Sequence, residues 1–296
     1  MPDQKRILPG LLDAEKRVEL NELFLLKAVA LALEEDFIEN DVTTSALAGF
    51  DGPARARVLA REAGIISGIH PFRETCRQVD PELQVEPRLS DGSPCRAGEV
   101  VLQVQGRKSS VLKAERTALN FLGRLSGVAT ATNLYVEKVK PLGVVLLDTR
   151  KTTPGLRYME KEAVVHGGGA NHRLHLAEMA LIKDNHISMA GSLGRAVELV
   201  RLANPGLPVE VEVQNLAQLA EALSLGVEMV MLDNFSAAMV DQAVSLKTTG
   251  VKYELSGNVT LNNISSRLQP GMDFVSVGAL THGCRSIDFT LEFEEA

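Results

Sequence analysis

Four apolar segments in the second half of the chain recur at an almost constant interval, and this spacing constrains the fold more than any other feature. The segments are PVEVEV (208–213), VEMVMLD (227–233), VKYELSG (251–257) and DFVSVGA (273–279). Their polar ends, Glu212, Asp233, Ser256 and Ser276, lie 21, 23 and 20 residues apart. Helical patterns at 215–226, 236–250 and 262–271 separate them. Repeated strand–helix units of this length predict a parallel sheet, either doubly wound or closed into a barrel.

Two apolar segments further upstream extend the pattern, GVVLLD (143–148) and LAEMALIKD (176–184). Polar or charged residues stand at the end of nearly every one of these six predicted strands. A barrel brings the carboxyl ends of all its strands around one mouth. A doubly wound sheet uses mainly the strand ends beside its switch point. The distribution of polar residues therefore favours the barrel.

The first 115 residues follow a different pattern, a mixture of helices and strands without a clear period. Helices are predicted at 13–35 and 69–78, and strands at 54–62 and 99–106. The longest apolar run, LFLLKAVALAL (23–33), is interrupted by Lys27 and is too short to span a bilayer. We interpret it as a helix that faces a protein core.

Composition excludes several classes of protein. The net charge of −7, the 4% of aromatic residues and the absence of tryptophan argue against a nucleic-acid-binding protein. Three widely spaced cysteines, Cys76, Cys95 and Cys284, form no CxxC pair. Such spacing is typical of a reduced, cytoplasmic protein. The opening segment MPDQKRILPG has no signal-peptide pattern.

Cationic residues gather around two of the predicted strand ends. DTRKTTPGLR (148–157) places Arg150 and Lys151 directly after a buried strand, and HGGGANHR (166–173) brings His172 and Arg173 behind three glycines. Lys183 ends the following strand. Arginine binds carboxylates and phosphates bidentately, so these residues predict an anion site. A solvated basic loop, or a metal site built from His166, His172 and His175, would explain parts of the pattern.

Acidic residues follow in the next strands. In PVEVEV the side chains of Glu210 and Glu212 share one face and the valines share the other. If the valines pack beneath the helices, both glutamates point into the barrel. Glu212 and Asp233, at neighbouring strand ends, would then suit Mg²⁺, which is commonly held by one or two carboxylates together with water and phosphate oxygens. A solvated edge strand is the alternative.

The last two strand ends predict a phosphate cradle. ELSGNVT (254–260) and SVGALTH (276–282) each place serine and glycine after a strand. In barrels, backbone N–H groups of these final loops often bind phosphate. A tight turn alone would explain either segment. The chain contains neither GxxxxGK[ST] nor GxGxxG, which disfavours an ordinary nucleotide-binding fold.

Several long motifs, in the same order, resemble the quinolinate phosphoribosyltransferase family. They are ERTALNFLGRLSGVAT (115–130), DTRKTTPGLR, HGGGANHR with LIKDNHI (181–187), VEVEV, MLDN (231–234), ELSGN and SVGALTH. The resemblance implies an N-terminal α/β sandwich domain at 1–115, to which 284–296 return, and an incomplete, seven-stranded α/β barrel at 116–283. It also implies a homodimer and a transfer of phosphoribosyl from 5-phosphoribosyl 1-diphosphate to quinolinate. The products would be nicotinate mononucleotide, pyrophosphate and CO₂, a step of de novo NAD synthesis.

The resemblance also implies a role for each matching residue. Thr149, Arg150, His172 and Arg173 would bind quinolinate, and Arg116 would come from the partner subunit. Lys151 and Lys183 would lie between the two substrates, and Glu212 and Asp233 would handle Mg²⁺–diphosphate and the ribose. The 5-phosphate would be held by Ser256, Gly257, Asn258, Ser276, Gly278 and Ala279. Asn258 departs from a second glycine common in this family, and it could contact phosphate or tolerate a left-handed turn.

Two rival functions remain open at this point. A phosphoribosyltransferase of the same fold could take another pyridine acid, such as nicotinate, which needs fewer cations than a diacid. A non-catalytic anion-binding protein could also use this scaffold, although it would have no reason to combine cations, acidic metal ligands and phosphate loops.

Overall fold

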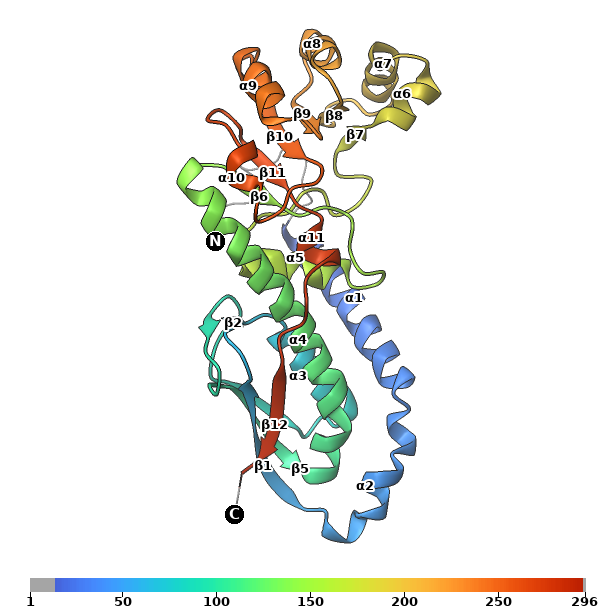
Figure 1. Cartoon of the computed structure of the whole chain (residues 1–296). Coiled ribbons are helices and arrows are strands. Elements are labelled where there is room, and N and C mark those ends of the chain that lie inside the picture. Colours follow the sequence, from blue (N-terminus) through green and yellow to red (C-terminus); the bar gives the residue numbers. More distant parts are fainter. Residues whose placement is uncertain (1–13, 295–296) are drawn as a thin grey trace. The chain divides into compact units, whose positions relative to one another are not determined.

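The computed structural model describes residues 14–294 of the chain (Figure 1). The prediction that the chain has no signal peptide concerned the opening segment, and that segment lies outside these residues. The described chain forms two compact units. The first, here called the barrel unit, contains 134–151 and 169–279, and the second, the sheet–helix unit, contains 15–133, 152–168 and 280–294. Each is described by itself.

The sheet–helix unit is built on a four-stranded antiparallel sheet in the order β12-β1-β5-β3. The strands are β1 (Pro53–Ala60), β3 (Gln84–Pro87), β5 (Val100–Arg107) and β12 (Phe289–Phe293). In β1, Ala56, Val58 and Ala60 are buried, while Arg55, Arg57 and Leu59 alternate to the other face. Helix α3 (Ile69–Val79) packs Phe72 into the same apolar core.

The C-terminal segment completes this sheet. Strand β12 pairs antiparallel with β1, with Leu291 opposite Val58 (Figure 1). Just before it, Ile287 donates its N–H to the carbonyl of Gly123 on helix α4 (Lys108–Val139) at 3.0 Å. A Cβ atom at Gly123 would lie 2.7 Å from the carbonyl oxygen of Ile287. Glycine is therefore needed for the close approach.

The remaining elements of this unit are short except for two helices. They are α1 (Ala14–Glu35), η2 (Ile38–Asn40), α2 (Val42–Ala46), η3 (Ala48–Phe50), β2 (Gly64–Ile65), β4 (Pro94–Cys95) and α5 (Arg157–His166). Strands β2 and β4 pair with each other. Helix α4 runs without a break through residues 115 and 116, where the sequence places a domain boundary. The predicted boundaries stay a prediction.

The barrel unit contains a six-stranded parallel sheet in the order β6-β11-β10-β9-β8-β7 (Figure 1). The strands are β6 (Val145–Leu147), β7 (Ala180–Ile182), β8 (Val209–Val213), β9 (Met229–Asp233), β10 (Lys252–Ser256) and β11 (Phe274–Ser276). All six strands predicted from the apolar segments are confirmed. A seventh strand, implied by the family resemblance, is not part of this sheet within residues 14–294; Ala170 and Leu147 form one isolated parallel bridge.

Helices follow the strands as their spacing predicts. They are α6 (Asp184–Ala190), α7 (Leu193–Ala203), α8 (Leu216–Ser224), α9 (Ala237–Ser245), α10 (Ile264–Arg267) and α11 (Ala279–His282), within which the chain passes from the residues of the barrel unit to those of the sheet–helix unit. Asn215 and Ser236 cap α8 and α9, because their side chains accept the N–H groups of Gln218 and Met239. The 3₁₀ turn η4 (Lys140–Leu142) precedes β6. Between residues 14 and 294, no helix is long and apolar enough to cross a membrane.

Candidate active site

A cavity of about 550 Å³ lies at the carboxyl ends of the barrel strands. Because the strands are parallel, residues that follow strands far apart in the sequence meet there. The cavity is lined by Thr149, Arg150, Lys151, His172, Arg173, Leu181, Lys183, Glu212, Met231, Asp233, Asn234, Glu254, Ser256, Gly257, Asn258 and Ser276. Twelve of the fifteen predicted site residues are among them. The others are Gly278, which follows β11, Ala279, which begins α11, and Arg116 on α4.

A lysine and a glutamate form an ion pair in this cavity. In the parallel register Ile182 of β7 lies opposite Val211 of β8, so the next residues, Lys183 and Glu212, adjoin each other. Lys183 Nζ lies 2.9 Å from Glu212 Oε2. The Lys183 side chain is 43% exposed and that of Glu212 is 12% exposed. The pair therefore faces the cavity, where a substrate can reach both charges.

Two guanidinium groups supply further positive charge. Arg173 is buried, and its Nη1 donates to the carbonyl of Met179 at 2.8 Å. Burial, and after it the charge of neighbouring Arg150, lowers the pKa of Arg173. Both effects penalise the charged guanidinium, and a bound anion would offset them. The position of the two arginines supports the predicted anion site.

Asp233 is held by a chain of amide groups. Asn234 Nδ2 donates to Asp233 Oδ2 at 2.9 Å, and Asn258 Nδ2 donates to Asn234 Oδ1 at 2.9 Å. Both asparagines have left-handed backbone, with φ of 56° and 50°. The interpretation of Asn258 as a left-handed turn residue is confirmed. Gly257, which directly precedes Asn258, has φ of 81°. A Cβ atom there would lie 2.8 Å from Asp233 Oδ1, so glycine is required.

The two serine loops meet beside this chain. Ser276 Oγ donates to Ser256 Oγ at 3.1 Å across the ends of β11 and β10. Arg267 donates from Nη1 to the carbonyl of Gly257 at 2.5 Å and from Nη2 to that of Phe235 at 3.0 Å. This arginine ties together the loops that follow β9 and β10. Arg267 was not among the predicted site residues.

Three buried acidic side chains lie in the barrel interior, and one of them, Glu254, also lines the cavity. Glu210 and Glu254 are fully buried, and burial is the largest cause that raises the pKa of each to about 8. Asp148 Oδ1 accepts the N–H of His172 at 2.9 Å. The prediction that Glu210 points into the barrel is confirmed. Glu254 shows the same pattern as Glu210, because it alternates with the apolar Tyr253 and Leu255 along β10. It was nevertheless not among the predicted site residues.

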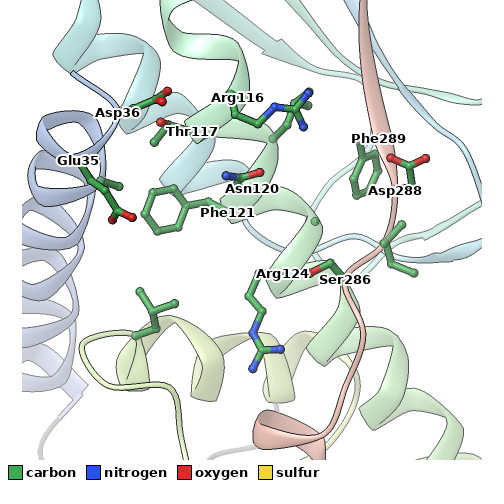
Figure 2. Close-up of a pocket in the computed structure, with 15 residues that line it drawn as sticks. Glu35, Asp36, Arg116, Thr117, Asn120, Phe121, Arg124, Ser286, Asp288 and Phe289 are labelled. Carbon is green, nitrogen blue, oxygen red and sulfur yellow. The ribbon is translucent and has the colours of Figure 1, made fainter. Parts of the chain in front are cut away.

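Arg116 lines a second cavity, of about 690 Å³, within the sheet–helix unit (Figure 2). Figure 2 shows Arg116, Asn120 and Arg124 along α4, with Glu35 and Asp36 at the end of α1 beside them. The Arg116 side chain is exposed. Arg124 forms an ion pair with the buried Glu160 at 2.7 Å. Arg116 thus lines a polar hollow of its own unit and is not among the residues that line the barrel cavity.

The fold and the barrel cavity define the class of protein: an α/β-barrel enzyme whose mouth suits a polyanionic substrate. Two family models match the chain, the N-terminal domain of quinolinate phosphoribosyl transferase at 41–126 and its C-terminal domain at 128–292. The chain belongs to the quinolinate phosphoribosyltransferase family.

Individual relatives agree with this membership. The nicotinate-nucleotide pyrophosphorylase [carboxylating] of Mycobacterium leprae is 39% identical over 267 residues, which cover 88% of this chain and 94% of the relative. The chloroplastic enzyme of that name from Arabidopsis thaliana is 39% identical, with 91% and 83% covered. The solved structure of nicotinate-nucleotide pyrophosphorylase from Francisella tularensis matches with a TM-score of 0.86 and 38% identity, covering 93% of this chain and 97% of that one.

Proposed function

We propose that this chain transfers the phosphoribosyl group of 5-phosphoribosyl 1-diphosphate to quinolinate, with decarboxylation, in NAD biosynthesis. The products are nicotinate mononucleotide, pyrophosphate and CO₂. One observation carries the proposal beyond family membership: a single cavity combines two arginines, two lysines, two carboxylates at neighbouring strand ends and two serine loops. A pyridine diacid and a sugar diphosphate together need these groups.

The acid half of the site is the cationic side. Arg150 and Arg173 hold the two carboxylates of quinolinate, with Thr149 and His172 beside them, and Lys151 stands between the acid and the sugar. A diacid offers one carboxylate to each of the two guanidinium groups, whereas a monoacid such as nicotinate offers a single carboxylate. The pair of arginines therefore favours the diacid.

The sugar half is the side of the serine loops. Ser256, Gly257 and Asn258, together with Ser276, Gly278 and Ala279, form the cradle for the 5-phosphate. The left-handed backbone at Gly257 and Asn258 supports this assignment, because turns of this kind point successive N–H groups into a concave surface. Asp233, fixed by Asn234, faces the ribose hydroxyls and the diphosphate.

Glu212 and Asp233 are the residues that would hold Mg²⁺, which when bound would neutralise charge on the leaving diphosphate. The donor set fits a hard cation, because both groups are carboxylates at the ends of adjacent strands and line the same cavity. Lys183 already pairs with Glu212. It supplies positive charge to the same region.

The reaction needs no covalent nucleophile from the protein. The C1–O bond to diphosphate breaks as the pyridine nitrogen forms a bond to ribose C1. The ring nitrogen is then positively charged, so it stabilises the electron pair that stays on C2 when CO₂ leaves, and this pair takes a proton. The chain contributes by orienting the two substrates and by placing charge where it develops.

A direct assay tests this function. Purified protein is mixed with quinolinate, phosphoribosyl diphosphate and Mg²⁺, and nicotinate mononucleotide and CO₂ are followed together, with nicotinate as a parallel substrate. We expect both products from quinolinate alone. Turnover of nicotinate without CO₂ would move the acid specificity, and no product from either acid would reject the proposal. Omission of Mg²⁺ in the presence of a chelator tests the metal, and we expect product formation to stop.

A homodimer with Arg116 contributed across the interface, in a reducing cytoplasm, is part of the same proposal. The exposure of Arg116 and the unpaired state of all three cysteines support it. Mixing the variants Arg116→Ala and Lys183→Ala tests the shared site. After subunit exchange, each mixed dimer has one intact site, so roughly a quarter of the wild-type activity should return. No recovery, with mixed dimers demonstrated by a tag, would place Arg116 in its own subunit's site or outside it.

A further inference from the structure

His172 uses both of its ring nitrogens inside the protein. Nε2 lies 2.9 Å from Glu210 Oε2 and 3.4 Å from Glu254 Oε2. On the other side of the ring, Nδ1 accepts the backbone N–H of Arg173 at 2.8 Å. All three side chains are buried, the two glutamates completely. The imidazole therefore spans from the barrel interior to the backbone of Arg173.

These contacts determine where the ring carries its proton. A nitrogen that accepts a hydrogen bond has a lone pair and no hydrogen. Protonation of Nδ1 would set its N–H against the N–H of Arg173 at 2.8 Å. The proton must stay on Nε2, where Glu210 Oε2 can accept it at 2.9 Å and Glu254 Oε2 lies 3.4 Å away. The ring is thus neutral, and its orientation is set by groups on β8 and β10.

We infer that Glu210, Glu254 and the neutral imidazole of His172 form a buried strut that positions Arg173 for the acid substrate. This inference rests on the proposed function for the identity of the acid. His172 then contributes no charge to quinolinate, and Glu210 and Glu254 are positioning residues. The charge for the acid within this unit comes from the arginines and lysines of the cavity.

The geometry distinguishes this strut from a metal centre. Ligand atoms of His172, Glu210 and Glu254 lie within 4.8 Å of one another, as metal ligands would. A cation there would need the lone pair of Nε2, and the ring proton would move to Nδ1. That nitrogen faces the N–H of Arg173. The nearby guanidinium of Arg173, whose charge acts on Glu210, also disfavours a second cation.

Nuclear magnetic resonance of the histidine rings tests the tautomer directly. The full-length protein is labelled with ¹⁵N-histidine, and the ring of His172 is assigned by its loss in His172→Gln. At pH 7 and without added metal we expect one ring proton, on Nε2. A ring protonated on both nitrogens, a proton on Nδ1, or an Nε2 that loses its proton when Mn²⁺ or Zn²⁺ is added would overturn the inference. This measurement does not depend on turnover.

Kinetics and quinolinate binding test the positioning role. In Glu210→Leu the Nε2–H loses its nearer acceptor, so we expect the KM for quinolinate and its calorimetric Kd to rise by about tenfold or more. The KM for phosphoribosyl diphosphate should change by less than about twofold, because the serine loops are untouched. Glu210→Gln keeps an oxygen acceptor and should bring the KM for quinolinate back to within about threefold of wild type.

A matched substitution at a glutamate that contacts the other end of β8 controls for general damage. Glu228 Oε2 accepts the N–H of Val209 at 2.9 Å, at the opposite end of β8. Glu228→Leu should therefore affect stability without changing the KM for quinolinate. The positioning role would be overturned if Glu210→Leu raised the KM values for both substrates equally. It would also be overturned if Glu210→Gln did not restore the KM for quinolinate. If the wild type turns over no quinolinate, the proposed function fails, and the ring proton still decides whether the strut exists.

Discussion

Replacing Lys183 with alanine should separate the activity of this protein from its stability. Lys183 Nζ lies 2.9 Å from Glu212 Oε2. At an effective dielectric constant of about 20 the bare attraction would be roughly 6 kcal/mol. The Lys183 side chain is 43% exposed, however, so water and the cost of ordering it cancel most of this attraction. Exposed pairs contribute about 0.2–1 kcal/mol, and we expect the free energy of unfolding to fall by no more than about 1 kcal/mol.

The effect on catalysis should be much larger. Lys183 faces the cavity. In the proposed reaction, negative charge develops there on the leaving diphosphate. Loss of one group that stabilises such charge typically costs about 10²–10³-fold in rate. We expect kcat/KM for Lys183→Ala to fall by at least about a hundredfold, measured from initial rates of nicotinate mononucleotide formation, while urea titration shows the small loss of stability.

Lys252→Ala is the matched control for this substitution. Lys252 Nζ also lies 2.9 Å from a carboxylate oxygen, that of Asp273, and its side chain is 52% exposed. It begins β10 and so lies at the amino ends of the strands, away from the cavity. The two variants should lose similar stability, but only Lys183→Ala should lose activity. Wild-type turnover in Lys183→Ala, or an equal loss in Lys252→Ala, would refute the reasoning.

Three further substitutions probe other parts of the chain. Asn258→Gly keeps a left-handed turn but removes the bond to Asn234, so initial rates should give a KM for phosphoribosyl diphosphate that is roughly threefold higher or more. Burial raises the pKa of Glu254 from 4.5 to about 8. Its contribution to stability is therefore fully present below pH 4.5 and lost as the pH rises toward 8. Urea titrations across this range should show a smaller loss in Glu254→Gln. Gly123→Ala would press a methyl group on the carbonyl of Ile287, and the free energy of unfolding should fall by roughly 1–3 kcal/mol in the same titration.

The barrel could be predicted because its signal is local. Each strand is a short apolar segment with a polar end, and parallel topology brings those ends together without further information. The ion pair of Lys183 with Glu212 follows from the same logic, since they end neighbouring strands in register. The pairing of β6 with β11 is different. It joins segments about 130 residues apart, and neither strand's sequence specifies its neighbour.

Helix α4 shows where local signals mislead. Its 32 residues contain Gly123 and Gly127, which are unfavourable inside an isolated helix. Their value lies in the segment that returns before β12, because the carbonyl of Ile287 approaches the helix at Gly123. Tertiary contact therefore determines that α4 forms one continuous helix across these glycines. Propensity alone would have divided the helix.

Residue type also sets a limit on what can be concluded about charge. Taken as a sequence, His172 and Arg173 are two cations beside an anion site. In the structure one backbone hydrogen bond, from the N–H of Arg173 to Nδ1 of His172, is incompatible with a charged ring. If the inference above holds, His172 is a neutral support and Arg173 carries the charge that meets the proposed acid substrate. The number of cations available to a substrate depends on which lone pairs the fold has already used, and this number emerges only when every hydrogen bond of the site is placed.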